Sequence, residues 1–221
     1  MPELEAVFFD LDGTLADTAP GLARAANLLR QAEGLPPLPL EVLRPAASHG
    51  SPAMLAAALG LGPDHPRFPE LRQRFLDLYA RHLDRATRLF PGMGEVLEAL
   101  GRRGLAWGIV TNKPRRFTEA VLRGLGLAGR PACVVSGDST PRAKPDPLPL
   151  VHACRLAGCT PARAVYVGDA ERDVVAARRA GMRALVAGFG YLGADDRPEA
   201  WGAEAVVPSP REILRWIEAH A

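Results

Sequence analysis

Residues 6–15 have the sequence AVFFDLDGTL, in which a short apolar run ends at two carboxylates. The four apolar residues at 6–9 predict a strand that is buried on both faces of a sheet. Asp10 and Asp12 follow two positions apart, and the turn residue Gly13 comes next. At strand spacing both carboxylates can face one side of the chain, so the pair needs a cation or a shared proton.

Similar apolar runs recur along the chain, and amphipathic segments separate most of them. We expect further strands at 105–110, 132–135, 164–167, 184–187 and 205–207, and helices at 92–103, 115–125, 147–157, 171–180 and 210–218. Continuous apolar strands suit a sheet that is covered on both faces. The alternation therefore predicts an α/β fold with a Rossmann-like, doubly wound parallel sheet.

One long gap interrupts this alternation. Roughly ninety residues lie between the first two expected strands, where a single crossover helix would be usual. Apolar residues at helical spacing and proline-rich breaks predict that this stretch is helical. We therefore expect a small helical domain at 17–83, inserted into a core domain formed by 1–16 and 84–221.

Length and composition exclude several classes of protein. The chain has 221 residues, a net charge of +2 and 48% hydrophobic residues, enough for one domain that carries an insert. The balanced charge argues against a nucleic-acid binder, and no apolar run approaches the ~18–20 residues of a membrane span. The acidic start lacks the basic region of a signal peptide, and three cysteines without a CxxC pair favour a cytoplasmic protein. Only two of the 27 basic residues are lysines, Lys113 and Lys144.

Polar residues gather where the expected fold would place a site. Residues at or just past the carboxyl ends of strands include Asp10, Asp12, Thr111, Asn112, Ser136 and Asp169. In open α/β sheets ligands bind at that edge. Carboxylates there can hold Mg²⁺, and one of them can attack phosphorus. Lys144 offers a fixed charge for a transferring phosphoryl group, and hydroxyl and amide groups can bind its oxygens.

Four stretches carry a resemblance to a known superfamily. They are DLDGTL at 10–15, VTNK at 110–113, KPDP at 144–147 and GDAERD at 168–173. In this order they resemble the four motifs of the haloacid dehalogenase-like hydrolases, and the resemblance covers the whole chain. The helical insert resembles the C1-type cap of that superfamily. Within the superfamily the chain resembles the phosphoglycolate phosphatase group. Longer stretches at 89–93, 107–114, 134–138 and 188–191 resemble a narrower branch, the N-acetylmuramic acid 6-phosphate phosphatases of bacterial cell-wall recycling.

The resemblance implies a Mg²⁺-dependent phosphatase that acts on a small cytosolic phosphomonoester through an aspartyl phosphate. N-acetylmuramic acid 6-phosphate is the favoured substrate, and 2-phosphoglycolate is the alternative. The implied catalytic residues are Asp10 as nucleophile, Asp12 as general acid and base, and Lys144. The implied phosphate ligands are Thr111, Asn112 and Lys144, and the implied metal ligands are Asp10, the backbone carbonyl of Asp12, and Asp169. Asp173 would hold a metal-bound water or Lys144.

The cap is expected to contact the part of the substrate beyond its phosphate. In C1-capped relatives a glycine-containing loop reaches over the active site, which makes Ser48, His49, Gly50 and Arg44 candidates for substrate specificity. Helix capping is the alternative role for Ser48. The expected partner is a small phosphorylated metabolite, with no nucleic acid or membrane, and the protein is expected to be a monomer or a homodimer. A phosphosugar mutase and a non-catalytic regulatory protein are the rival functions.

Overall fold

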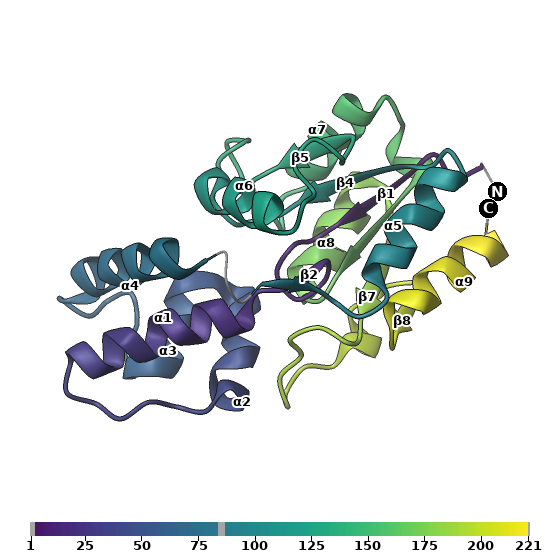
Figure 1. The fold of residues 1–221 in the computed structure, drawn as a ribbon. Helices are drawn as coiled ribbons and strands as arrows, with labels where there is room; N and C mark the ends of the chain where they lie inside the picture. The colour runs from purple at the N-terminus through teal and green to yellow at the C-terminus, as the bar shows by residue number, and fades with distance from the viewer. Residues whose placement is uncertain (1–2, 84–86, 221) are drawn as a thin grey trace.

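The computed structural model describes residues 3–83 and 87–220. Within them, a six-stranded parallel sheet has the order β5-β4-β1-β6-β7-β8 (Figure 1). Its strands are β1 (Ala6–Phe9), β4 (Ala106–Val110), β5 (Cys133–Val135), β6 (Ala164–Gly168), β7 (Arg183–Ala187) and β8 (Ala205–Val207). The predicted α/β class with a parallel sheet is confirmed.

The register of the central strand brings three strand ends together. Phe9, the last residue of β1, lies opposite Ile109 of β4 and Val167 of β6. The strands are parallel, so the residues that follow them leave the sheet at one edge. This register explains why segments about a hundred and sixty residues apart can build one site.

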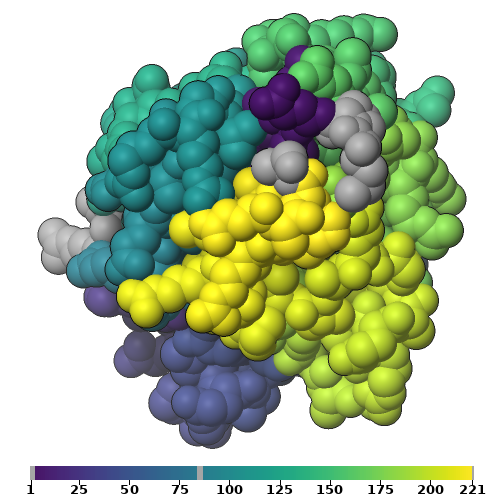
Figure 2. Space-filling model, turned by 90° about the vertical axis from the view of Figure 1, so that its right-hand side faces the viewer, coloured from purple at the N-terminus to yellow at the C-terminus, as the bar shows by residue number. Residues whose placement is uncertain are grey.

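Helices cover both faces of the sheet. Ala6 and Phe8 of β1 share one core cluster with residues of α7 (Leu148–Ala157) and α8 (Glu171–Ala180). Val7 and Phe9 face the other cluster, built with α5 (Met93–Arg102), α6 (Arg115–Gly124) and α9 (Pro210–His220). Figure 2 shows α9 and α5 side by side on this second side of the molecule. Burial on both sides accounts for the continuous apolar strands.

A helical insert follows β1, as predicted. It contains α1 (Ala19–Ala32), α2 (Leu40–Leu43), the 3₁₀ helix η1 (Arg44–His49), α3 (Gly50–Leu59) and α4 (Phe68–His82). Helix α1 packs against both α3 and α4, and the insert forms a separate lobe beside the sheet (Figure 1). The exact limits at 17 and 83 stay a prediction, and the second one borders residues 84–86, which lie outside the described residues.

Some short elements of the structure were not predicted from the sequence. Strands β2 (Ala16–Asp17) and β3 (Arg88–Leu89) pair antiparallel at the base of the insert, and two residues are too few to create a sequence period. Two 3₁₀ turns, η2 (Pro161–Arg163) and η3 (Pro198–Ala200), complete the described elements. Among the helices of residues 3–83 and 87–220, none combines the length and apolar character needed to cross a bilayer.

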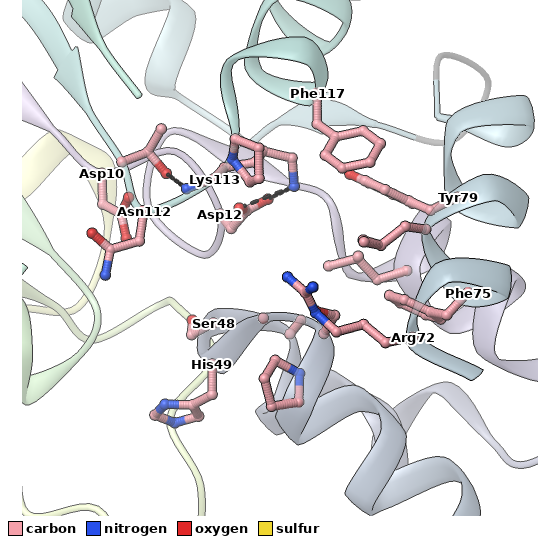
Figure 3. Close-up of a pocket in the computed structure, with 18 of the residues that line it drawn as sticks. Asp10, Asp12, Ser48, His49, Arg72, Phe75, Tyr79, Asn112, Lys113 and Phe117 are labelled. Carbon is pink, nitrogen blue, oxygen red and sulfur yellow. Dashed lines mark hydrogen bonds and ion pairs between the residues drawn. The ribbon is translucent and has the colours of Figure 1, made fainter. Parts of the chain in front are cut away.

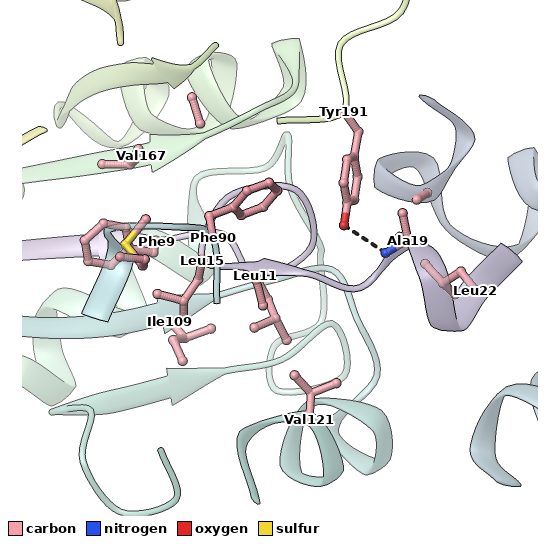
Figure 4. Packing of buried hydrophobic residues seen from close by; sticks show 14 of the residues in the cluster. Phe9, Leu11, Leu15, Ala19, Leu22, Phe90, Ile109, Val121, Val167 and Tyr191 are labelled. Atoms are coloured by element: carbon pink, nitrogen blue, oxygen red, sulfur yellow. Dashed lines mark hydrogen bonds between the residues drawn. The ribbon is translucent and has the colours of Figure 1, made fainter. Parts of the chain in front are cut away.

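The core of the sheet continues into the insert. Figure 4 shows Leu11 and Leu15 packed between the end of β1 and the start of α1. The hydroxyl of Tyr191 accepts hydrogen bonds from the backbone N–H groups of Thr18 and Ala19, at 2.7 and 2.9 Å. It donates to Asp17 Oδ1 at 2.7 Å. A single buried phenol from the core thus fixes the point where the insert begins.

Candidate active site

The loop after β1 presents its carboxylates by folding back on itself. The N–H of Asp10 donates to Val167 O at 2.9 Å, which extends the β1–β6 ladder by one residue. The N–H of Leu15 then returns to Asp10 O at 3.2 Å. Gly13 has φ +82°, and a Cβ there would lie 2.0 Å from Asp169 Oδ2. Glycine is therefore needed both for the backbone conformation and for the close contact with Asp169, which follows β6.

Three buried carboxylates meet at this edge of the sheet. Oxygens of Asp10, Asp169 and Asp173 all lie within 4.8 Å of one another. Lys144 Nζ lies 3.1 Å from Asp10 Oδ1 and 2.8 Å from Asp173 Oδ1. With all four groups ionised, the cluster carries a charge of −2, which a divalent cation would neutralise.

Asp169 supplies the clearest sign that a cation belongs here. Its Oδ2 accepts hydrogen bonds from Ser48 Oγ at 2.5 Å and from the N–H of Tyr191 at 2.9 Å. Its Oδ1 is buried and has no hydrogen-bond partner within the described part of the chain. Burial, together with the charges of Asp10 and Asp173, raises the pKa of Asp169 to about 7. Three carboxylates that offer hard oxygen donors, with the Asp169 Oδ1 atom left without a hydrogen bond, fit a divalent metal such as Mg²⁺.

The metal-free protein should lose stability as the pH rises from about 4 to about 7. Over that range the folded state holds the Asp169 proton, whose pKa is raised to about 7, more tightly than the unfolded chain does. The loss in the free energy of unfolding should be on the order of 4 kcal/mol. Urea unfolding in EDTA at a series of pH values measures it.

The matched control for this prediction is Asp169→Asn, which keeps an oxygen acceptor and removes the titration. It should flatten the pH dependence, and saturating Mg²⁺ should flatten it in the unmodified protein. An equally steep loss in the Asn variant would contradict the assignment to Asp169.

Lys144 is held from several directions. Its side chain is fully buried, and Nζ donates to Val110 O at 3.0 Å and to the Tyr166 hydroxyl at 2.6 Å. The side-chain amide of Asn112 binds its backbone twice, accepting from Lys144 N at 3.0 Å and donating to Lys144 O at 2.9 Å. The Asn112 side chain thus positions the lysine, and the phosphate contact expected of Asn112 stays a prediction. Thr111 is buried, and its Oγ1 accepts from the N–H of Lys113 at 3.2 Å.

Asp12 is paired with the second lysine of the chain. Lys113 Nζ lies 2.9 Å from Asp12 Oδ1 and 3.1 Å from Oδ2, and Thr18 Oγ1 also donates to Asp12. The ammonium lies over the ring of Tyr79, 4.8 Å from its centroid. Burial favours a lower pKa for Lys113, but Asp12 outweighs it and the pKa lies above its ordinary value. Lys113 therefore links the carboxylate of the core to a tyrosine of the insert.

A pocket of about 340 Å³ lies between the sheet edge and the insert, beside Asp10 and Asp12 (Figure 3). The core contributes Asp10, Asp12, Thr111, Asn112, Lys113 and Phe117, and the insert contributes Ser48, His49, Gly50, Arg72, Phe75 and Tyr79. Polar groups line one end and aromatic rings line the other (Figure 3). This division suits a ligand with a charged end and an apolar body.

Hydrogen bonds connect the insert, at residues 48 and 49, to the core beside the carboxylates. Besides the Ser48 hydroxyl bond to Asp169, Arg172 donates to Ser48 O at 2.6 Å and lies 3.1 Å from His49 Nδ1. Gly50, with φ +73°, starts α3 at the pocket wall. Arg44 lies elsewhere, paired with Asp17 at 2.9 Å, and does not line the pocket.

Three residues with direct contacts here were absent from the sequence-based candidates. Arg72 and Tyr79 line the pocket from α4, which the sequence marked only as a helix with an apolar face. Arg172 contacts the insert from α8 and was likewise not among those candidates. Spacing within α4 could have placed Arg72, Phe75 and Tyr79 on one side of a helix, but nothing in the sequence says that this side meets Asp12.

Buried acidic groups at the edge of a parallel sheet, closed by a helical insert, suit a capped enzyme that binds a divalent metal and an anionic ligand. The chain belongs to the haloacid dehalogenase-like hydrolases, whose sequence profile matches residues 4–181. It is a phosphatase of this family. The family predicted from the four motifs is thereby confirmed.

The chain is similar to phosphatases of two kinds. The chain is 44% identical to the N-acetylmuramic acid 6-phosphate phosphatase of Pseudomonas aeruginosa, over 96% of this chain and 93% of the relative. It is 42% identical to a phosphoglycolate phosphatase of Xanthomonas campestris, over 94% of each chain. A crystal structure of a predicted phosphoglycolate phosphatase from Haemophilus somnus superimposes with a TM-score of 0.85 at 26% identity, covering 98% of this chain and 99% of that one.

Proposed function

We propose that this phosphatase is Mg²⁺-dependent and hydrolyses N-acetylmuramic acid 6-phosphate. The observation that carries the proposal is the size and lining of the pocket beyond the carboxylates. A volume of about 340 Å³ falls within the ~300–1,000 Å³ of sites that hold drug-sized ligands. A two-carbon acid such as 2-phosphoglycolate would leave much of it unfilled, whereas an amino-sugar phosphate has the bulk to occupy it. The similarity to the Pseudomonas aeruginosa enzyme supports the same substrate.

The alternative substrate is 2-phosphoglycolate, which the similarity to the Xanthomonas campestris enzyme favours. Both candidates are small phosphorylated metabolites. The cytoplasmic location and a monomeric or homodimeric state, expected from the sequence and its resemblance, belong to the same proposal.

The proposed reaction has two displacements at phosphorus. In the first, a carboxylate oxygen of Asp10 attacks phosphorus, the P–O bond to the sugar breaks, and Asp12 gives a proton to the departing oxygen. In the second, water attacks the aspartyl phosphate, Asp12 takes its proton, and the P–O bond to Asp10 breaks. Inorganic phosphate leaves, and both carboxyl groups return to their initial state.

The remaining residues position charge around these displacements. Lys144 holds the Asp10 carboxylate at 3.1 Å and brings a positive charge to the phosphoryl group, which Thr111 and Asn112 also adjoin. Mg²⁺ bound at Asp10, Asp169 and the Asp12 carbonyl would supply the charge that offsets the phosphate oxygens. Asp173, at 2.8 Å from Lys144, keeps the lysine in place.

The proposed substrate should be hydrolysed with a kcat/KM at least about 100-fold above that for 2-phosphoglycolate, because only the sugar fills the apolar end of the pocket. Phosphate release is measured with Mg²⁺ and equal concentrations of the two esters. A preference for 2-phosphoglycolate would overturn the substrate assignment and leave the reaction class intact.

A further inference from the structure

One arginine faces the pocket and has no acidic partner among residues 3–83 and 87–220. Arg72 lies on α4, and Figure 3 shows its guanidinium directed into the cavity, across from Asp10. Its Nε donates to Ser51 Oγ at 3.0 Å. Within residues 3–83 and 87–220, its two terminal nitrogens make no hydrogen bond and no ion pair. Arg74 on the same helix, in contrast, pairs with Glu33 at 2.7 Å.

The other basic groups of the pocket are already engaged. Lys113 pairs with Asp12 at 2.9 Å, and Arg172 binds Ser48 O at 2.6 Å. Burial and the charge of Arg172 lower the pKa of His49, so its imidazole is neutral near pH 7. Among the described residues of the pocket, Arg72 is therefore the arginine whose two terminal nitrogens are both free to bind a ligand.

We propose that Arg72 binds a carboxylate of the substrate, at the end of the molecule opposite the phosphate. The inference rests on the proposed phosphatase function and adds a residue that selects the substrate. The two terminal nitrogens of a guanidinium match the two oxygens of a carboxylate. The Ser51 bond to Nε fixes the side chain and leaves that pair of nitrogens open. Helix α3 starts at Gly50 on the same wall, and its positive end favours an anion there.

The shape of the proposed substrate fits this placement. N-acetylmuramic acid 6-phosphate carries its phosphate on C6, attached at C5, and its lactyl carboxylate on O3, at C3, so the two anionic groups diverge from separate carbons of the sugar ring. In the pocket, Asp10 and Arg72 come from the core and from the insert, with the cavity between them (Figure 3). Phe75 and Tyr79, on the same helix as Arg72, offer an apolar surface to the ring.

The test compares two esters that differ only in the lactyl group, N-acetylmuramic acid 6-phosphate and N-acetylglucosamine 6-phosphate. Arg72→Gln should lower kcat/KM for the muramic acid ester by about 10- to 100-fold, mainly through KM. The same variant should change kcat/KM for the glucosamine ester by less than about twofold. Arg81→Gln, an exposed arginine on the same helix that does not line the pocket, is the matched control and should change neither value.

Two results would overturn the inference. Equal losses on both esters would show that Arg72 supports the insert, and unchanged values on both would show that it does not touch the substrate. If neither sugar ester is hydrolysed and 2-phosphoglycolate is, the proposed substrate is wrong. In that case kcat/KM of the Arg72→Gln variant is measured for 2-phosphoglycolate and for ethyl phosphate, which lacks the carboxylate. A loss confined to 2-phosphoglycolate supports the inference, and any other pattern refutes it.

Discussion

Asp10→Asn should lower kcat by at least about 10⁴-fold, because an amide cannot serve as the attacking nucleophile. The fold should survive, since Asn fills the same space at the end of β1 and the backbone bond to Val167 is unchanged. One of the charges that raise the pKa of Asp169 also disappears. Phosphate release measures the loss, and urea unfolding at pH 7 should give a stability equal to or above that of the unmodified protein.

An exposed aspartate provides the control for this substitution. Asp64 lies in the loop before α4, and Asp64→Asn should leave kcat unchanged. Mass spectrometry after acid quenching should find a phosphoryl adduct on the active protein and none on Asp10→Asn. Turnover by the Asn variant above about 1% of the normal rate would rule out Asp10 as the nucleophile.

Lys144→Met should have the largest combined effect on stability and activity. The substitution leaves Asp10 and Asp173 buried without their shared cation, and breaking a buried pair in this way costs about 3–5 kcal/mol. The rate should fall by on the order of 10³-fold, because a fixed positive charge at the phosphoryl group is lost. Urea unfolding in EDTA and phosphate release measure the two effects separately.

A second substitution separates these effects. Asp173→Asn, added to Lys144→Met, removes one unpaired charge and keeps an oxygen that can accept from the N–H of Ala170. The double variant should regain part of the lost stability and none of the lost activity. If stability in the double variant falls further, the ion pair is not what holds this cluster together.

Most of the fold could be predicted because the signals are local. Each strand of the sheet is an apolar run flanked by turn residues, and β1 matches its expected range, 6–9, residue for residue. Helix α8 likewise spans the expected 171–180. The β2–β3 pair could not be found, since Ala16 and Leu89 meet through tertiary contact and neither belongs to a periodic pattern.

The carboxylates at the centre of the site could also be predicted from the sequence. Asp10 and Asp169 follow strands that a parallel sheet must place side by side, so topology alone brings them together. The contacts of Arg72, Tyr79 and Arg172 depend on how the insert sits on the sheet edge. That placement is set by packing across the two lobes, which leaves no mark at any one position of the sequence.

The scarcity of lysine gives the molecule a chemical property of its own. Lys113 and Lys144, the two lysines of the chain, are 8% and 3% exposed. Apart from the α-amino group, an acylating reagent therefore meets no amine on the folded surface. Lys113 lines the pocket, where a small reagent can reach it, whereas the fully buried side chain of Lys144 becomes accessible only when the core opens. An acyl group found on Lys144 would thus record an opening of the core, so the protein carries its own built-in probe of such openings.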